Sequence, residues 1–150
     1  MITNNEKTVA LLTHLSTLSQ YFFPFGNFIL PLIIWSSARK DSQFMDENGK
    51  EAINFQLSVF LYTICLALVA IPILLFSVFR NVPLSQVVDG SDWGHHLSMG
   101  NITGIAVVAL IAVLIFCLLK VAEFFLVIYA SVKAANGEAY QYPLRIKFIK

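Results

Sequence analysis

The feature that most constrains the fold is a long charge-free stretch, residues 57–79. It contains no Asp, Glu, Lys or Arg, and it is longer than the ~20 residues that a helix needs to cross a bilayer. A second apolar run, residues 102–135, would measure ~50 Å as one helix, so it must tilt, bend or protrude from a ~30 Å hydrocarbon core. Because 57% of the 150 residues are hydrophobic and only 13% are charged, we expect one integral membrane domain, residues 1–150.

A third apolar run, near the N-terminus, is interrupted. Residues 10–23 carry leucines at helical spacing with polar residues on the opposite side. Pro24 and Gly26 break this pattern, and residues 28–38 are apolar again. The two pieces could form one kinked transmembrane helix, or an interfacial helix followed by a short membrane-dipping one. In the second case the polar face meets headgroups or lines a polar cavity. We therefore predict an all-α, polytopic membrane helical bundle with three or four membrane-embedded helices, the first broken at Pro24 and Gly26.

Residues 44–56 form a charged passage between two apolar runs. Asp46 or Asn48 can cap a helix, and Glu51 follows Asn48 by three positions, so the pattern predicts a helix start here. One polar stripe then continues along an otherwise apolar helix, at positions Glu47, Glu51, Asn54 and Ser58. We expect Glu51 and Asn54 to hold this helix to the tail or to the first helix, and the stripe is also a candidate docking face.

Three short blocks carry a family resemblance: PFGN (residues 24–27), GKEAINFQ (residues 49–56) and NGEAYQYPL (residues 136–144). In this order they resemble a group of small bacterial membrane proteins of unknown function that is similar to the Tic twenty component of the chloroplast inner-envelope import translocon. The resemblance covers about residues 14–148. It implies a multi-pass protein of the bacterial inner membrane and a role beside membrane-protein or translocation complexes, and it carries no catalytic motif.

Two charges, Lys120 and Glu123, interrupt the last apolar run three positions apart, so they share a helix face and can pair. Charged groups inside a bilayer are costly and often functional. We expect an ion pair with polar partners on the first or second helix. The alternative is that the membrane ends near Leu119 and both residues lie among headgroups.

Other site chemistry is weakly indicated. The polar segment 80–101 contains Asp89, Asp92, His95 and His96, but adjacent side chains point apart and no second cluster supplies further metal ligands. Both cysteines, Cys65 and Cys117, fall in apolar runs. The net charge of +1 offers no basic field for nucleic acid. We expect no enzyme activity, no metal and no cofactor.

The basic residues predict the orientation. They gather after the first run (Arg39, Lys40 and Lys50) and in the tail (Lys133, Arg145, Lys147 and Lys150), whereas segment 80–101 holds Arg80 alone. The first two segments should be cytoplasmic, which leaves the side of the N-terminus open. We therefore expect a non-enzymatic multi-pass membrane protein whose partners are the lipid bilayer and other membrane proteins or a second copy. The alternative is an oligomeric carrier or ion pathway that uses Lys120 and Glu123.

Overall fold

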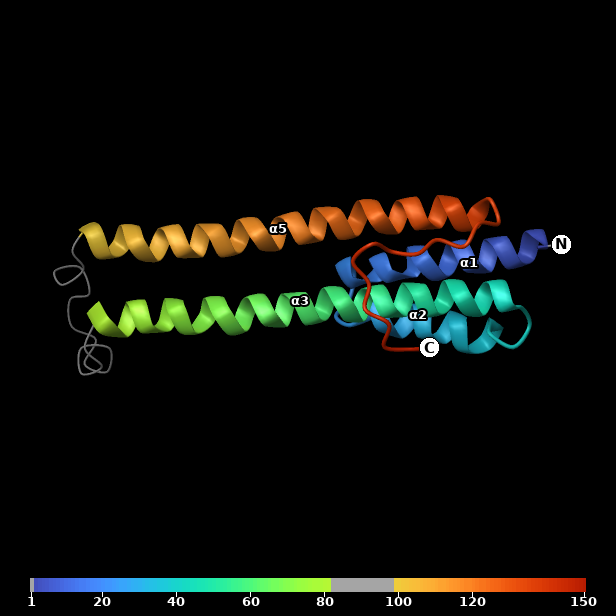
Figure 1. Ribbon diagram of the computed structural model, residues 1–150, viewed down its shortest axis with the longest axis horizontal. Coiled ribbons are helices and arrows are strands. Elements are labelled where there is room, and N and C mark those ends of the chain that lie inside the picture. Colours follow the sequence, from blue (N-terminus) through green and yellow to red (C-terminus); the bar gives the residue numbers. More distant parts are fainter. Residues whose placement is uncertain (1, 82–98) are drawn as a thin grey trace. The chain divides into compact units, whose positions relative to one another are not determined.

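The computed structural model describes residues 2–81 and 99–150, and the side chains of residues 2–77 and 104–150. The regular elements of this described part are all helices: α1 (Asn4–Ser16), the 3-10 helix η1 (Thr17–Tyr21), α2 (Gly26–Ala38), α3 (Gln43–Asn81) and α5 (Met99–Ala135) (Figure 1). The predicted all-α class is therefore confirmed for the described residues. The chain divides into unit 1, Met1–Leu61 with Lys120–Lys150, and unit 2, Tyr62–Leu119.

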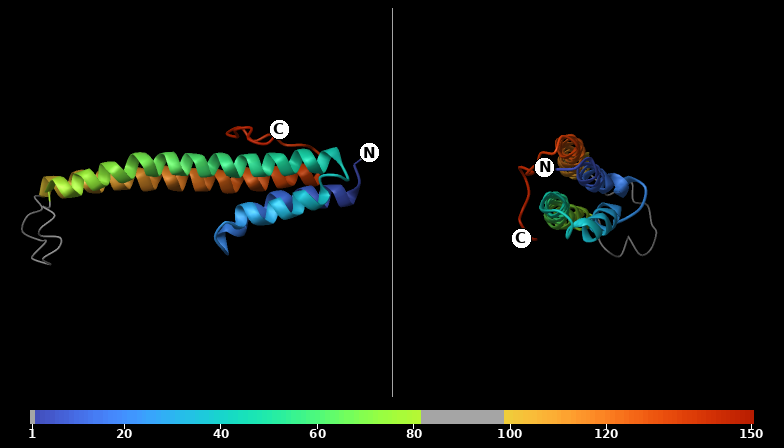
Figure 2. Two further views of the ribbon diagram at one scale, coloured as in Figure 1. Left: turned by 90° about the horizontal axis from the view of Figure 1, so that it is seen from below. Right: turned by 90° about the vertical axis from the view of Figure 1, so that its right-hand side faces the viewer.

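In unit 1, α1 and η1 lie antiparallel beside α2 and form a helical hairpin (Figure 2). Phe25 has a left-handed backbone, with φ of 61°, and reverses the chain just before α2. Gly26 follows it, and a Cβ at this position would lie 2.5 Å from Ser19 Oγ. The predicted break at Pro24 and Gly26 is confirmed. Because the two pieces fold back on each other, the alternative of one kinked helix is wrong.

The polar side of this hairpin faces the interior of unit 1. Thr13, His14 and Thr17 are at most 2% exposed, whereas Phe22 in the turn is 88% exposed. The interpretation in which this polar face meets headgroups is therefore wrong. That interpretation fails because the polar groups find hydrogen-bond partners inside unit 1, and these hydrogen bonds offset the cost of burying them.

Helix α3 begins at Gln43, earlier than the cap predicted at Asp46 or Asn48. Asp46 instead lies in the first turn, where its carboxylate accepts from Trp35 Nε1 at 2.9 Å and pairs with Lys50 at 2.6 Å. Asn48, two residues after Asp46, is fully buried. The prediction failed because both side chains serve tertiary contacts rather than the helix end.

The core of unit 1 joins α3, the end of α5 and the C-terminal tail. Phe55 and Val59 of α3 pack against Val127 and Ala130 of α5, and Tyr142 of the tail completes the cluster. Helix α5 ends at Ala135; beyond it Gly137 has φ of 83°, and Glu138 N–H donates to the Lys133 carbonyl. The tail then turns back and crosses to α3 (Figure 1).

Two of the described helices are long and apolar enough to cross a membrane. These are Gln43–Ser77, with mean hydropathy 2.7 in its most apolar window, and Gly104–Ala135, with 3.0. Helix α2 is apolar, but its 13 residues span only ~20 Å. The expected three or four membrane-embedded helices are therefore not confirmed, and two candidates stand.

In unit 2, the α3 and α5 segments expose most of their large apolar side chains, including Leu68 and Val69 on α3 and Leu110 and Leu118 on α5. Cys65 and Cys117 also lie here, exposed and unbridged. Asp89, Asp92, His95 and His96 fall outside the described residues.

Candidate functional site: a tail-covered polar network

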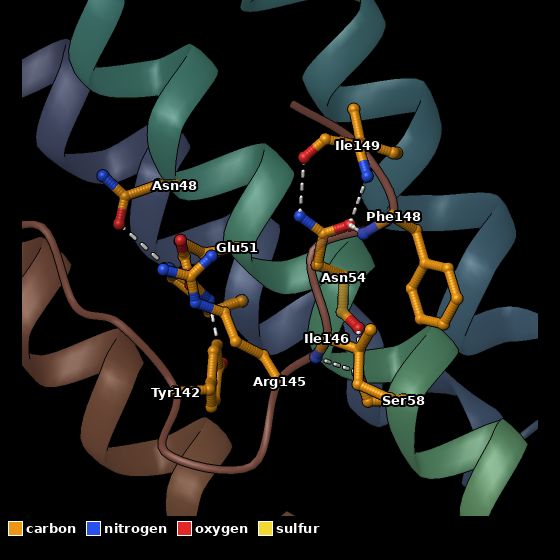
Figure 3. Close-up of polar contacts among 10 residues, drawn as sticks. Asn48, Glu51, Asn54, Ser58, Tyr142, Arg145, Ile146, Phe148 and Ile149 are labelled. Atoms are coloured by element: carbon orange, nitrogen blue, oxygen red, sulfur yellow. Dashed lines mark hydrogen bonds and ion pairs between the residues drawn. The ribbon is translucent and has the colours of Figure 1, made fainter.

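The polar stripe of α3 binds the C-terminal tail. Asn54 Nδ2 donates to the Ile149 carbonyl at 2.9 Å, and Asn54 Oδ1 accepts from the Ile149 and Phe148 N–H groups at 2.8 and 3.1 Å (Figure 3). One turn further on, Ser58 Oγ accepts from the Ile146 N–H at 2.7 Å. Asn54 and Ser58 are both buried. The candidate docking face is therefore occupied by the protein's own tail.

The two acidic residues of the stripe differ in their surroundings. Glu51 pairs with Arg145 of the tail at 2.8 Å, and both side chains are largely shielded, at 13% and 10% exposed. Glu47 is exposed, and its carboxylate accepts from the Gln43 side chain at 2.7 Å. Between the start of α3 and the tail lies a polar groove of about 330 Å³ that both glutamates line. The stripe thus fixes the tail through Glu51, Asn54 and Ser58, while Glu47 faces outward.

A buried chain of hydrogen bonds centred on His14 joins α1, α3 and the tail. His14 Nδ1 lies 3.0 Å from the Tyr142 hydroxyl, and Nε2 lies 3.0 Å from Asn48 Oδ1. Because Asn48 Nδ2 donates to the Phe44 carbonyl, its Oδ1 is the acceptor here, so Nε2 carries the hydrogen and Tyr142 donates to Nδ1. Burial lowers the pKa of His14 from 6.5 to about 4. The imidazole is therefore neutral at pH 7.

Lys120 and Glu123 form the ion pair that their spacing predicted. Lys120 Nζ lies 2.8 Å from Glu123 Oε2, and Gln20 of η1 donates to Glu123 Oε1 at 2.7 Å while accepting from Lys120 at 3.0 Å. Glu123 is 1% exposed. Both carboxylate oxygens of Glu123 have hydrogen-bond partners within unit 1. One partner is Gln20, so the polar group expected from the first helical region is also present.

Sequence reasoning missed His14, Tyr142 and Gln56. Asn27 in α2 donates to the Gln56 side chain in α3 at 2.9 Å, which ties the second arm of the hairpin to the same helix. A signal existed for all three: a lone histidine sits on the polar side of an amphipathic helix, and Gln56 and Tyr142 lie in blocks that carry the family resemblance. No local pattern indicates that His14 and Tyr142 meet.

The network supports a structural role. Its members are amides, hydroxyls, one neutral imidazole and two ion pairs, each engaged by a neighbour. Among the described residues, no group of three or more His, Cys, Asp and Glu side chains is placed to hold a metal ion. The arrangement can hold the tail and the hairpin against α3, which is a structural role.

These features define a class: a membrane-associated protein that is all-helical in its described residues, with two helices apolar enough to cross a membrane and a polar network that holds its C-terminal tail. Residues 5–149 match the model of the magnetosome magnetite crystal formation protein family. Since the match covers nearly the whole chain, the protein belongs to this family. This match does not confirm the resemblance to the Tic twenty component. It is compatible with the broader expectation of a membrane protein family of unclear function.

No curated protein and no solved structure matched the chain.

Proposed function

We propose that this protein is a non-enzymatic, multi-pass protein of the cell (inner) membrane that acts as an accessory or assembly component of membrane-protein complexes. The observation that carries the proposal is the exposure of the two apolar helices. In their most apolar windows only 6% and 0% of the residues are buried, whereas a core helix of a soluble protein buries its apolar side chains. Lipid or another membrane protein must therefore cover these helices.

Unit 1 supports a role through contacts rather than chemistry. Its polar side chains bind one another: Asn54 holds the tail backbone, Glu51 pairs with Arg145, and His14 joins Asn48 and Tyr142. A partner that docks on the folded protein would meet the exposed apolar faces of α3 and α5 instead of the polar stripe. We propose that the partner is another membrane protein or a second copy of this chain.

The family's name concerns magnetite crystal formation. A mineral-forming site would call for clustered carboxylates or histidines that hold iron. The described residues contain no such group, so the proposal rests on the membrane helices and on the folded unit.

The orientation remains as the basic residues predict, with the α2–α3 connection and the tail cytoplasmic. The structure adds a reason to place the N-terminus on the same side. His14 in α1 binds Tyr142 in the tail within one compact unit. We therefore propose a cytoplasmic N-terminus, which the sequence left open.

The carrier alternative has no observation in its favour. Glu123 is held by Lys120 and Gln20, each of its carboxylate oxygens accepts a hydrogen bond, and the residue is 1% exposed. An ion pathway would need a charged group that exchanges partners during transport. Measuring ion flux in proteoliposomes tests this alternative directly.

Single-cysteine labelling tests the topology. In a Cys65→Ala, Cys117→Ala background, cysteines placed at Asn4, Ser42 and Gln141 should react with a membrane-impermeant maleimide only after the inner face is opened. Ser91, which lies outside the described residues, should react from the outside. Labelling of Ser91→Cys only from the inside would reverse the orientation, and opposite sides for Asn4 and Gln141 would contradict the shared location of the termini.

Photo-crosslinking tests the accessory role. A crosslinking amino acid at Val69, which is 61% exposed on α3, should capture a defined membrane protein or a second copy in native membranes. The matched control is the exposed Asp41, at the α2–α3 connection. If positions along the exposed faces of α3 and α5 all capture lipid alone, the protein does not act through helix contacts.

A further inference from the structure

We infer that the turn of the α1–α2 hairpin, residues 21–25, is a membrane anchor that inserts its aromatic side chains into the lipid bilayer where the hydrocarbon begins. The inference rests on the proposed membrane placement of α3 and α5 and adds a third, separate contact with lipid. The turn has the sequence YFFPF.

The exposure of the turn is unusual for large apolar side chains in a folded unit. Phe22 is 88% exposed, Phe25 63% and Tyr21 58%. Contiguous exposed apolar groups mark a surface that meets a partner or a membrane. Aromatic rings in particular gather at the boundary between headgroups and hydrocarbon.

The polar residues on either side of the turn point the other way. Gln20 precedes it and binds Glu123 and Lys120 of α5, while Asn27 follows it and binds Gln56 of α3. These two amides fasten both arms of the hairpin to unit 1. The aromatic residues between them are left facing outward, held in place by the left-handed backbone of Phe25.

The turn lies at the level on α3 where the charge-free stretch begins. Gln56, bound by Asn27, is the residue before residues 57–79, and Phe28 packs edge-on against Phe60 with ring centroids 5.8 Å apart. Phe60 and Leu61 are themselves 46% and 38% exposed. The aromatic turn therefore continues the exposed apolar surface of a candidate membrane helix, and this continuity favours lipid over a protein partner.

The other end of the hairpin is basic. Helix α2 ends at Ala38 and is followed by the exposed residues Arg39 and Lys40. Thirteen residues of helix separate these charges from the aromatic turn by ~20 Å. With the aromatic turn at the start of the hydrocarbon, these charges lie on the aqueous side beyond the headgroups, so the inference requires only the turn to enter the bilayer.

Spin-label depth measurements in nanodiscs test this inference. In a Cys65→Ala, Cys117→Ala background, a nitroxide is attached after Phe22→Cys, Leu68→Cys or Asp41→Cys, and its collisions with oxygen and with water-soluble nickel chelate are compared. We expect the Phe22 position to be several-fold less accessible to nickel than the Asp41 position, and shallower than the Leu68 position. Tyr21→Cys repeats the measurement at a second exposed residue of the turn.

The outcomes separate the two proposals. Nickel accessibility at Phe22 equal to that at Asp41 would place the turn in water and overturn the inference, while a lipid-exposed Leu68 would leave the proposed function intact. An immobile Phe22 label that neither reagent reaches would mean that protein, such as a second copy, covers the turn, which also overturns it. A water-exposed Leu68 would contradict the membrane placement itself.

Discussion

Asn54 holds the backbone of Ile149 from both directions, donating to its carbonyl at 2.9 Å and accepting from its N–H at 2.8 Å. The amide of one side chain thus pairs with the tail much as a neighbouring strand would. The contact involves no side-chain atom of Ile149. The tail is held at this point through its backbone, whereas Arg145 and Tyr142 contact α3 through their side chains.

We predict that Asn54→Leu releases the end of the tail. Leucine has the same branching and the same number of side-chain heavy atoms as asparagine, although it is bulkier, and it loses three hydrogen bonds. Because the last tail residues are mostly exposed, water takes over part of this bonding. We expect a loss of about 1–3 kcal/mol in the free energy of unfolding. Faster trypsin cleavage after Lys147, measured together with the melting temperature in detergent, should report it.

Glu47→Ala is the matched control. Glu47 lies on the same helix two turns earlier, is exposed, and accepts a hydrogen bond from Gln43. Cleavage after Lys147 should stay unchanged in this variant. Equal cleavage rates in Asn54→Leu and in the unmodified protein would show that Asn54 does not hold the tail.

Local patterns in the sequence predicted the parts of the site that follow helical spacing. The stripe of Glu51, Asn54 and Ser58 and the pair of Lys120 and Glu123 were both found because residues three or four apart share a helix face. Such features depend on neighbours along the chain.

Contacts between distant segments could not be predicted in this way. His14 and Tyr142 are 128 positions apart, and no periodicity in either segment indicates that they meet. For the same reason the sequence left the polar face of α1 open between headgroups and a polar cavity, since its partners lie on α3 and in the tail. The start of α3 was misplaced because Asp46 and Asn48 bond across the fold instead of capping the helix.

We predict that His14 makes unit 1 less stable in acid. Its pKa is about 4 in the folded protein and 6.5 when exposed. Between these values the unfolded chain binds a proton that the folded chain does not, so stability is complete above pH 6.5 and falls as the pH drops toward 4. The total loss should be about 3 kcal/mol. Chemical denaturation of the detergent-solubilised protein at a series of pH values measures it.

His14→Gln tests the assignment, because glutamine can donate and accept hydrogen bonds but does not titrate in this range. The variant is expected to be less stable at pH 7.5, so the comparison concerns the slope of stability against pH. The slope between pH 6.5 and 4 should decrease relative to the unmodified protein. An unchanged slope would assign the effect to other groups.

We predict that Tyr142→Phe costs about 1–3 kcal/mol at neutral pH, because it leaves the buried Nδ1 of His14 without its donor. The ring itself should stay in place, since Tyr142 stacks on Phe55 with centroids 4.0 Å apart. The exposed Tyr21→Phe removes a hydroxyl elsewhere in unit 1 and serves as the control. Equal melting temperatures for the two variants would argue against the buried hydrogen bond.

We predict opposite effects for the same substitution at two glycines. In Gly49→Ala the new methyl group would overlap the indole of Trp35, which bonds to Asp46, so the variant should lose about 1–3 kcal/mol. In Gly104→Ala the methyl group meets nothing within 4 Å, and a better helix former should be neutral or gain up to about 1 kcal/mol. Melting temperatures in detergent compare them, and a harmless Gly49→Ala would mean that Trp35 is loosely held.

We predict that Glu123→Ala lowers the amount of folded protein sharply, because it removes the buried carboxylate that accepts hydrogen bonds from Lys120 and Gln20 and offsets the Lys120 charge. Removing one member of a buried pair is costly, whereas replacing both by apolar residues of similar size is often tolerated. Lys120→Met with Glu123→Leu should therefore recover much of the folded protein.

Since the Lys120 side chain is 28% exposed, solvent screens part of the effect. The loss of stability in Glu123→Ala should therefore be at the lower end of the range for buried pairs. Fluorescence-detected size exclusion of the single and double variants gives the ratio, and equal yields for all of them would place the pair in water or headgroups.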